Sequence, residues 1–534
     1  MKSVFHFKDT LRLLYPVRVL ALGLAVSQVI ATVLVYLSNR ALAAKIAAIQ
    51  AAGYGPLPGV NIDPSLTSFE AAFAGGSFFT LSTGAGVTML TFGATLLFSS
   101  LAPLYRAWKT KSLKAGWRIP ALLAFLPATV AAAILIIAWP VLLIWANRHG
   151  LCPGMTAFLV LVPPPVIWAA TKWSPRKSGY TRLPWRTPIH FMLIAFLLAL
   201  WGWQVNKDVF INFRDNLLLT SGPGTRIVDF YYRYTLYPAE VFKRLADRQL
   251  KACVLEGFAD PAESGRLETV LRAHDYFVVP AGAVKPDLTL IRQGNGLALA
   301  RGGKPVITVE RERFMRLAGD ILDGFSEKVD HQFVFRRFTL VSLAGVAPLA
   351  LYLAVYGLFC LVPGILINVR ISSFLAPVLC FIFWAGVILY LGPPPPARID
   401  ADRAAAAIRE GSRKERIAAL RYIDGEKLDI GRFEGYQRLI DTTDPAQLYW
   451  LARTLGSSRD PAAGIALFRF LNSDSAYIVC KAMSSIARQA EKQGDPARRR
   501  TRNMLVRKME MADNWYIQFS AYKAARSLGW MPGK

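Results

Sequence analysis

Seven long apolar runs constrain the fold of this chain more than any other feature. The hydrocarbon core of a bilayer is about 30 Å thick, so a helix of roughly 20 apolar residues can cross it. Runs of about this length lie at 17–38, 77–102, 119–146, 155–172, 188–205, 338–362 and 373–393. Charged residues still make up 19% of the chain, as in proteins that also carry water-exposed domains. The sequence therefore predicts a polytopic α-helical membrane protein with about seven transmembrane helices.

The basic residues between the runs predict an orientation. Residues 1–205 hold 17 Lys and Arg against three acidic residues, and most of the basic ones precede the first run or follow the second and fourth. Cytoplasmic loops of multi-pass proteins carry this excess. The chain has no N-x-[ST] sequon, which favours a bacterial membrane. We expect a multi-pass protein of the bacterial cytoplasmic (inner) membrane, with its N-terminus in the cytoplasm and both soluble domains on the outer face. One miscounted span would move the C-terminal domain to the other side.

The composition argues against several functional classes. The net charge is +27, but about half of it lies in loops between the runs, so no nucleic-acid partner is expected. The runs contain no Asp or Glu, which argues against a proton-coupled carrier. The five histidines are scattered and no C-x-x-C occurs, so we expect no cofactor and no metal. Cys152 and Cys253 would share the outer compartment, which leaves a disulfide between them open.

The runs also divide the chain into domains. We expect transmembrane helices 1–5 in 1–205, interfacial helices in 206–249, a small α/β domain in 250–337, transmembrane helices 6–7 with a Pro-rich linker in 338–396, and a helical domain in 397–534. Within the α/β domain, alternating apolar residues and Gly-containing turns predict strands at 252–258, 276–281, 287–293, 296–302 and 305–311. Helices are expected at 262–273 and 313–328.

The second run, GGSFFTLSTGAGVTMLTFG, is rich in small and hydroxyl-bearing residues. One series recurs every four residues, and a second pair of small residues lies beside it. These positions are Gly76, Thr80, Gly84 and Thr88, with Ser82 and Gly86 as the second pair. Small residues at this spacing are typical of close helix packing. A polar groove or an unwound segment that lines a path for an ion or substrate is the alternative interpretation.

After the fifth run, a short helix with a weak apolar stripe at Phe210, Phe213 and Leu217 is expected to lie along the membrane surface. The turn-like SGPG at 221–224 is expected to break it. A second helical pattern runs from 225 to about 249, where Pro238 predicts a kink or a new helix start.

The stretch FYYRYTLYPAE at 230–240 sets four tyrosines and an arginine in seven residues. Tyrosines just beyond a span are typical of an interfacial belt. The arginine can stack on their rings, bind a lipid phosphate or pair with a nearby acid. The candidate contacts to lipid or to a partner are Tyr231, Tyr232, Arg233, Tyr234, Tyr237 and Asp229.

A loose repeat occupies roughly the last 140 residues. ERIAALRYI begins at Glu415, QLYWLARTLG at Gln447, YIVCKAMSSIA at Tyr477 and YIQFSAYKAARSLG at Tyr516. Turns led by Asp444, Asp474 and Asp513 precede the last three of these segments. The pattern resembles HEAT-type repeats, and a generic helical bundle is the alternative. The resemblance implies an α-solenoid whose stacked helices bind protein partners, and it brings no catalytic residues.

Three functional hypotheses follow. The first is a non-enzymatic membrane subunit or scaffold that binds membrane lipids and other proteins of an envelope complex, with an exposed patch on the repeats or beside the tyrosines. The second is a transporter or channel component, with polar residues converging around Thr80, Gly84 and Thr88. The third is a membrane enzyme acting on lipid or envelope substrate, with a cleft into which Arg233, Asp229 and a tyrosine hydroxyl point. We rank them in this order.

Overall fold

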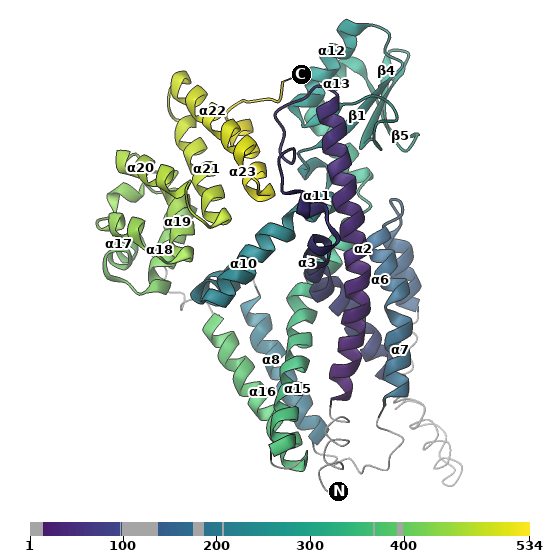
Figure 1. Cartoon of the computed structure of the whole chain (residues 1–534), viewed down its shortest axis with the longest axis vertical. Coiled ribbons are helices and arrows are strands. Elements are labelled where there is room, and N and C mark those ends of the chain that lie inside the picture. The colour runs from purple at the N-terminus through teal and green to yellow at the C-terminus, as the bar shows by residue number, and fades with distance from the viewer. Residues whose placement is uncertain are drawn as a thin grey trace. The chain divides into compact units, whose positions relative to one another are not determined.

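The computed structural model describes residues 14–96, 98, 137–174, 186–205, 208–366, 369–391 and 399–533 (Figure 1). This part of the chain is mostly helical and contains one small sheet. It divides into two compact units. The first, called the apolar unit, comprises Met1–Val35, Phe73–Val205 and Asp330–Leu389. The second, called the mixed unit, comprises Tyr36–Ala72, Asn206–Val329 and Tyr390–Lys534.

The apolar unit is built from helices, two of which contain a short π-helical turn. Its elements are the first part of α2 (Tyr15–Ala51), most of α3 (Phe69–Phe79), the π-helix η2 (Thr80–Gly84) with the helix 85–96 after it, the helix Ile137–Ala146, α6 (Pro153–Leu161), α7 (Pro163–Lys172), α8 (Arg186–Gln204), α14 (Phe333–Val341), the π-helix η6 (Ser342–Val346), α15 (Ala347–Leu366) and α16 (Val369–Leu391). A π-turn inserts one residue into an α-helix and is frequently found at functional sites.

Within the described residues, three helices are long and apolar enough to cross a membrane: Tyr15–Ala51, Pro153–Lys172 and Phe333–Leu361. The count of about seven is therefore met only in part. The runs at 188–205 and 373–393 form α8 and α16, whose described apolar stretches, Met192–Gln204 and Leu375–Tyr390, are shorter. Much of the run at 119–146, the end of the run at 77–102 and the Pro-rich linker at 392–398 lie outside the described residues.

The mixed unit contains a five-stranded sheet of order β2-β1-β3-β4-β5. Its strands are β1 (Lys251–Glu256), β2 (Tyr276–Val278), β3 (Leu288–Gln293), β4 (Gly296–Arg301) and β5 (Lys304–Glu310). The central strand β1 runs parallel to β2 and β3, and β3, β4 and β5 pair antiparallel. All five strands lie where the sequence predicts them, and so do the two helices α12 (Pro261–Ala273) and α13 (Arg311–Lys328).

Both faces of the sheet are covered, which explains why β1 reads as a nearly continuous apolar run. On one face, Cys253 of β1 packs with Leu271 of α12 and Phe314 of α13. On the other face, Ala252 and Val254 pack in a second core with residues of α2. The members of this second core are Leu42, Ile46, Ile49, Tyr54, Leu57, Leu66, Tyr237, Leu250, Ala252, Val254, Phe277, Val279 and Trp515.

The last third of the mixed unit is a helical domain. Its helices are α17 (Ala401–Glu410), α18 (Arg413–Gly425), α19 (Pro445–Leu455), α20 (Pro461–Phe470), α21 (Ala476–Glu491), α22 (Asp495–Met511) and α23 (Trp515–Ser527), with the 3-10 turns η7 (Ile430–Arg432) and η8 (Tyr436–Asp441). Side-chain caps explain several helix starts: Ser412 and Glu415 form a capping box, and Asp444 accepts from the first turn of α19. The helices α18, α19, α21 and α23 contact one another in that order, and we call them the central row.

The segment between α8 and the sheet differs from the sequence prediction. It forms α9 (Val209–Asn216), η4 (Leu218–Thr220), α10 (Gly222–Tyr234), α11 (Leu236–Phe242) and η5 (Leu245–Asp247). SGPG starts a helix as well as ending the preceding turn, because Ser221 caps α10 and Pro223 stands in its first turn. The expected helix from 225 to about 249 therefore begins earlier and is divided at Thr235.

Candidate functional site

The tyrosine-rich stretch packs against the central row of the helical domain. The ring of Tyr232 on α10 stacks on Tyr477 of α21 and on Tyr516 of α23, with ring centroids 5.3 and 4.8 Å away. Offset aromatic pairs at this separation are favourable beyond the area that they bury. Burial raises the pKa of Tyr232 to about 12, so its hydroxyl is neutral at physiological pH. The ring of Tyr232 therefore packs inside the protein. The sequence alone did not distinguish this position from one at the membrane interface.

Tyr237 on α11 is also internal. Its side chain is fully buried, its ring meets Trp515 of α23 edge to face at 5.1 Å, and its hydroxyl lies 3.5 Å from the carbonyl oxygen of Asn39 on α2. The three residues belong to different segments of the mixed unit. Tyr237 therefore joins α2, α11 and α23 within the second core of the sheet.

Arg233 stacks on a tyrosine ring, which is one of the alternatives that the sequence left open: its guanidinium lies over Tyr234, 5.7 Å from the ring centroid. Its guanidinium pairs with the carboxylate of Asp63 at 3.1 Å, and its side chain is 54% exposed. No ion pair to Asp229 is present among the described residues, and burial raises the pKa of Asp229. An exposed pair of this kind contributes little to stability, because water and salt screen it.

The remaining tyrosines differ in their surroundings, because Tyr234 packs against the second core of the sheet and Tyr231 does not. Tyr231 is exposed together with Ile227 and Phe230, and Tyr234 packs against Phe230 with ring centroids 5.1 Å apart. The six candidate residues are therefore divided. Tyr232 and Tyr237 pack into the protein, whereas Tyr231 belongs to an exposed apolar face of α10.

A buried carboxylate on α9 extends the contact with the central row. Asp215 is 1% exposed; it accepts a hydrogen bond from Nε of Arg214 at 2.8 Å and another from Nε1 of Trp450 at 2.7 Å. Its backbone carbonyl accepts from Arg413 of α18 at 2.9 Å. Sequence reasoning missed this residue. Asp215 and Trp450 are 235 positions apart, and no local pattern marks them as partners.

Arg214 and Arg421 complete the set of contacts. The guanidinium of Arg214 stands over the ring of Tyr449, 4.0 Å from its centroid. Arg421 of α18 donates to Asn212 of α9 at 2.6 Å and pairs with Asp208 at 3.0 Å. The expected stripe at Phe210, Phe213 and Leu217 is instead the less buried side of α9, because its polar side faces the central row.

Positive charge gathers around the ring of Tyr449. Burial raises the pKa of its hydroxyl, but the charges of Lys481 and Arg214 outweigh burial, so the net shift is downward. We call the contacts made by α9, α10 and α11 with the central row the clasp. Its residues are Asn212, Arg214, Asp215, Tyr232 and Tyr237 on one side and Arg413, Arg421, Tyr449, Trp450, Tyr477, Trp515 and Tyr516 on the other.

A second set of contacts joins α23 to the sheet. Asp275, in the turn before β2, accepts from the hydroxyl of Tyr522 at 2.8 Å and pairs with Arg526 at 3.1 Å. Its φ of 61° is unusual for a residue with a side chain. Burial raises the pKa of Asp275 despite these partners. The helical domain is therefore attached to the α/β domain through polar contacts as well as through Trp515.

In the apolar unit, the expected stripe of the second run faces α2. A methyl group at Gly84 would lie 2.7 Å from Oγ of Ser27, and Thr80 Oγ1 donates to Oε1 of Gln28 at 2.8 Å. The facing pairs are Gly76 with Thr32, Thr80 with Gln28, Gly84 with Ser27 and Thr88 with Gly23. The structure thus brings together all four residues of the stripe, each opposite a complementary residue of α2.

The second pair lies on another side of the same helix. Gly86 packs against Ser342 of η6, Ser82 donates to the carbonyl of Phe78 at 2.7 Å, and the hydroxyls of Thr83 and Thr339 are 2.8 Å apart. The π-helices η2 and η6 contact each other here. We call the four facing pairs, together with Thr83, Gly86, Thr339 and Ser342, the hydroxyl seam.

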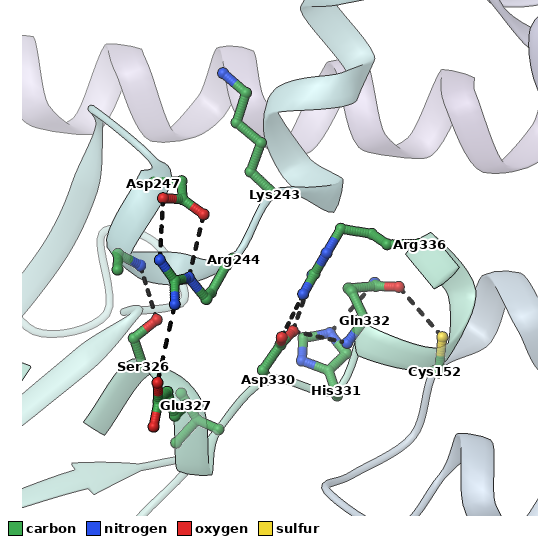
Figure 2. Close-up of polar contacts among 12 residues, drawn as sticks. Cys152, Lys243, Arg244, Asp247, Ser326, Glu327, Asp330, His331, Gln332 and Arg336 are labelled. Carbon is green, nitrogen blue, oxygen red and sulfur yellow. Dashed lines mark hydrogen bonds and ion pairs between the residues drawn. The ribbon is translucent and has the colours of Figure 1, made fainter. Parts of the chain in front are cut away.

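Figure 2 shows two groups of polar contacts, one within each unit. In the mixed unit, Arg244 binds both carboxylate oxygens of Asp247 at 3.2 and 3.3 Å, and Ser326 accepts from the amide of Ala246 at 2.7 Å. These contacts tie η5 to α13 within the mixed unit.

In the apolar unit, Arg336 forms two hydrogen bonds to Asp330, one of them 2.9 Å long (Figure 2). Burial raises the pKa of Asp330, but Arg336 outweighs burial and the pKa falls below its usual value. Cys152 donates to Gln332 at 3.2 Å. Cys152 and Cys253 do not form the disulfide that the sequence left open, since both are free and buried.

One cavity of about 610 Å³ opens between the first turns of α12 and α13. It is lined by Asp260, Ala262, Glu263, Arg266, Leu267, Arg311, Glu312, Met315 and Arg316. Glu263 is held by Arg292 at 2.9 Å and Arg311 at 3.1 Å, and Asp260 caps α12. Two of the three acids that line this cavity, Asp260 and Glu263, are therefore already engaged. In the described part of the chain, no three His, Cys, Asp or Glu side chains gather in a way that could hold a metal ion.

Comparison with protein-family models, with curated proteins and with solved structures finds no match to this chain. The function proposed below accordingly rests on the geometry of the chain itself.

Proposed function

We propose that this chain is a non-enzymatic integral membrane scaffold, a subunit of a bacterial envelope complex that recruits proteins through its α/β domain and its HEAT-like helical domain. The three apolar helices Tyr15–Ala51, Pro153–Lys172 and Phe333–Leu361 support the membrane anchor. The basic loops of the sequence support an inner-membrane location with a cytoplasmic N-terminus and both soluble domains on the outer face.

The observation that carries the proposal is the division of the helical domain into an engaged and a free side. The central row is engaged by the chain's own segment 208–237 through the clasp. Helix α20, outside the central row, exposes Ile465 and Phe468, whose side chains are 75% and 53% accessible. Two large apolar side chains one helical turn apart are a typical anchor for a protein partner. The partner surface is therefore proposed on α20.

Membrane lipids are the second proposed partner. Helix α10 buries Val228 and packs Tyr232 on the central row, and it exposes Ile227, Phe230 and Tyr231. Such a face lies in the headgroup region when an amphipathic helix rests on a bilayer. Arg233, which follows these residues and is half exposed, is placed to approach a lipid phosphate.

A membrane enzyme is the less favoured proposal, because the ion pair of Arg233 does not match the cleft that this hypothesis expects. It required Arg233 and Asp229 to point into a shared cleft. Arg233 is instead paired with Asp63 at the surface.

Affinity purification of the full chain from mild detergent tests the scaffold. The wild type is expected to recover a defined set of proteins, and the double variant Ile465→Asp, Phe468→Asp is expected to lose at least one of them. Met511→Asp is the matched control, since Met511 is 84% exposed in the same domain and receives the same charge. A wild type that is recovered alone, or equal losses in both variants, contradicts the proposal.

A further inference from the structure

Most hydroxyl groups of the hydroxyl seam and its helices are satisfied locally. The hydroxyl of Thr80 is shared between Gln28 Oε1 at 2.8 Å and the carbonyl of Gly76 at 3.1 Å. Thr32 and Thr339 each donate to the carbonyl four residues earlier in the helix, both at 2.7 Å. Thr95, farther along the second run, does the same with the carbonyl of Thr91 at 2.8 Å. This is the usual way in which an apolar helix accommodates Ser or Thr.

Three hydroxyls in these helices depart from this rule. The side-chain oxygens of Ser27, Thr88 and Thr91 are buried and have no hydrogen-bond partner. Ser27 and Thr88 are 0% exposed, and Thr91 is 4% exposed. Each of the first two is directed at a glycine across the seam: a methyl group at Gly84 would lie 2.7 Å from Ser27 Oγ, and one at Gly23 would lie 2.5 Å from Thr88 Oγ1. Unpaired polar atoms in an apolar interior are unfavourable, so a group that pairs them is expected.

The seam offers further oxygen ligands. The π-helices η2 and η6 contact each other beside Gly86 and Ser342, and the carbonyls of Thr80 and Ser342 accept from the amides of Ala85 and Ala347, five residues later. A carbonyl oxygen that accepts one hydrogen bond keeps a second lone pair, and backbone carbonyls together with hydroxyls coordinate monovalent cations in membrane proteins.

The charge of the surroundings selects the class of ligand. Residues 19–35 and 73–96 contain no charged residue. On the helix that contains η6, Arg336 is paired with Asp330 and Arg337 lies over the ring of Phe333, so the seam itself supplies neutral oxygen atoms. A divalent cation is ordinarily bound by carboxylates, which are absent from these segments. Hydroxyl groups can donate to an anion, but the backbone carbonyl oxygens beside them would repel it. Neutral oxygen atoms that lie close together can replace the hydration shell of a monovalent cation and coordinate it.

We propose that the hydroxyl seam between α2, the helix that contains η2 and the helix that contains η6 binds a monovalent cation through Ser27, Thr88 and backbone carbonyls. This goes beyond the scaffold function, which does not require an ion. It also extends the packing interpretation of the stripe, because close packing explains the glycines but leaves these hydroxyls unpaired.

The experiment measures the unfolding midpoint of the full-length protein in detergent. Sodium chloride or potassium chloride replaces choline chloride stepwise at constant ionic strength, and sodium gluconate separates the cation from chloride. The wild type is expected to show a saturable rise in midpoint with sodium or potassium. Ser27→Ala and Thr88→Val are each expected to lose that rise. Thr95→Val is the matched control and is expected to keep it, since its hydroxyl is already paired with Thr91.

The variants also distinguish a ligand from an empty seam. If the seam holds no cation, Thr88→Val replaces an unpaired buried hydroxyl by a methyl of the same shape, and the midpoint rises equally in every salt. Any one of three results overturns the proposal. The first is this equal rise in every salt, the second is a wild-type midpoint that does not change with sodium or potassium, and the third is an equal salt response in all variants. Should Thr88→Val fail to fold, the smaller change Ser27→Ala gives the same comparison.

Discussion

Asp215→Asn is expected to loosen the clasp without changing the shape of any side chain. The carboxylate is 1% exposed and neutralises Arg214, whose side chain is 13% exposed. An asparagine at 215 leaves the Arg214 guanidinium buried without its counter-ion. If the NH2 group of the asparagine faces the indole N–H of Trp450, two donors oppose each other. Breaking a buried pair by removing one partner costs about 3–5 kcal/mol. The lower value corresponds to roughly a hundredfold increase in the equilibrium for local opening.

Hydrogen exchange of the full-length protein measures this opening directly. The backbone amides of Val209–Tyr234 and of α19 are expected to exchange faster in Asp215→Asn, whereas the sheet keeps its wild-type rates. Asp441→Asn is the control, because Asp441 pairs with Arg469 at 2.7 Å in the same domain but is 72% exposed. That exposed pair is worth less than about 1 kcal/mol. Unchanged exchange over Val209–Tyr234 in Asp215→Asn would refute the reasoning.

The remaining predictions concern the packing around the clasp and the seam. Trp515→Ala, at a 2% exposed site, is expected to cost about 3–5 kcal/mol in chemical unfolding, and a loss below about 1 kcal/mol contradicts its role. Burial lowers the pKa of Lys251 to about 8 from 10.5, so the wild type gains stability as pH rises through this window. Lys251→Met is therefore expected to be more stable by about 3 kcal/mol at pH 7, with the advantage shrinking towards pH 10.5; a pH-independent difference counts against this. Arg233→Ala is expected to change stability by less than about 1 kcal/mol, and a larger loss would reveal a second partner. Gly86→Val is expected to prevent close packing on Ser342 and lower the thermal midpoint, and a wild-type midpoint would show that this approach is not needed.

The sequence predicted the local parts of this fold well. The strands β1 to β5 could be predicted because short apolar runs alternate with glycine-containing turns. The strand preference of the residues in these runs agrees with the strands that the structure shows. The helix start at Asp444 was marked by its cap and by Pro445. The stripe at Gly76, Thr80, Gly84 and Thr88 was correctly placed on one face, since helical spacing alone determines it.

The clasp was not predictable in the same way. Its contacts join residues about 200 or more positions apart, such as Asp215 with Trp450, and no periodic pattern encodes which distant helix a side chain meets. The tyrosines at 231–237 were assigned to the membrane interface because they follow a span, but Tyr232 and Tyr237 pack into the protein. The π-turns also escaped prediction. They depend on how the Thr80–Gly84 and Ser342–Val346 segments pack, which local propensity does not specify.

The most direct test of the account replaces Tyr232 with the photoreactive aromatic amino acid p-benzoylphenylalanine and irradiates intact membranes. The clasp predicts a cross-link within one chain to α21 or α23, close to Tyr477 or Tyr516, with no change in the mass of the polypeptide. A cross-link to lipid, to another protein or to a second copy of the chain would contradict it. In that case Tyr232, like Phe230 and Tyr231, would belong to an interfacial or partner-binding surface, and segment 208–237 would not engage the central row.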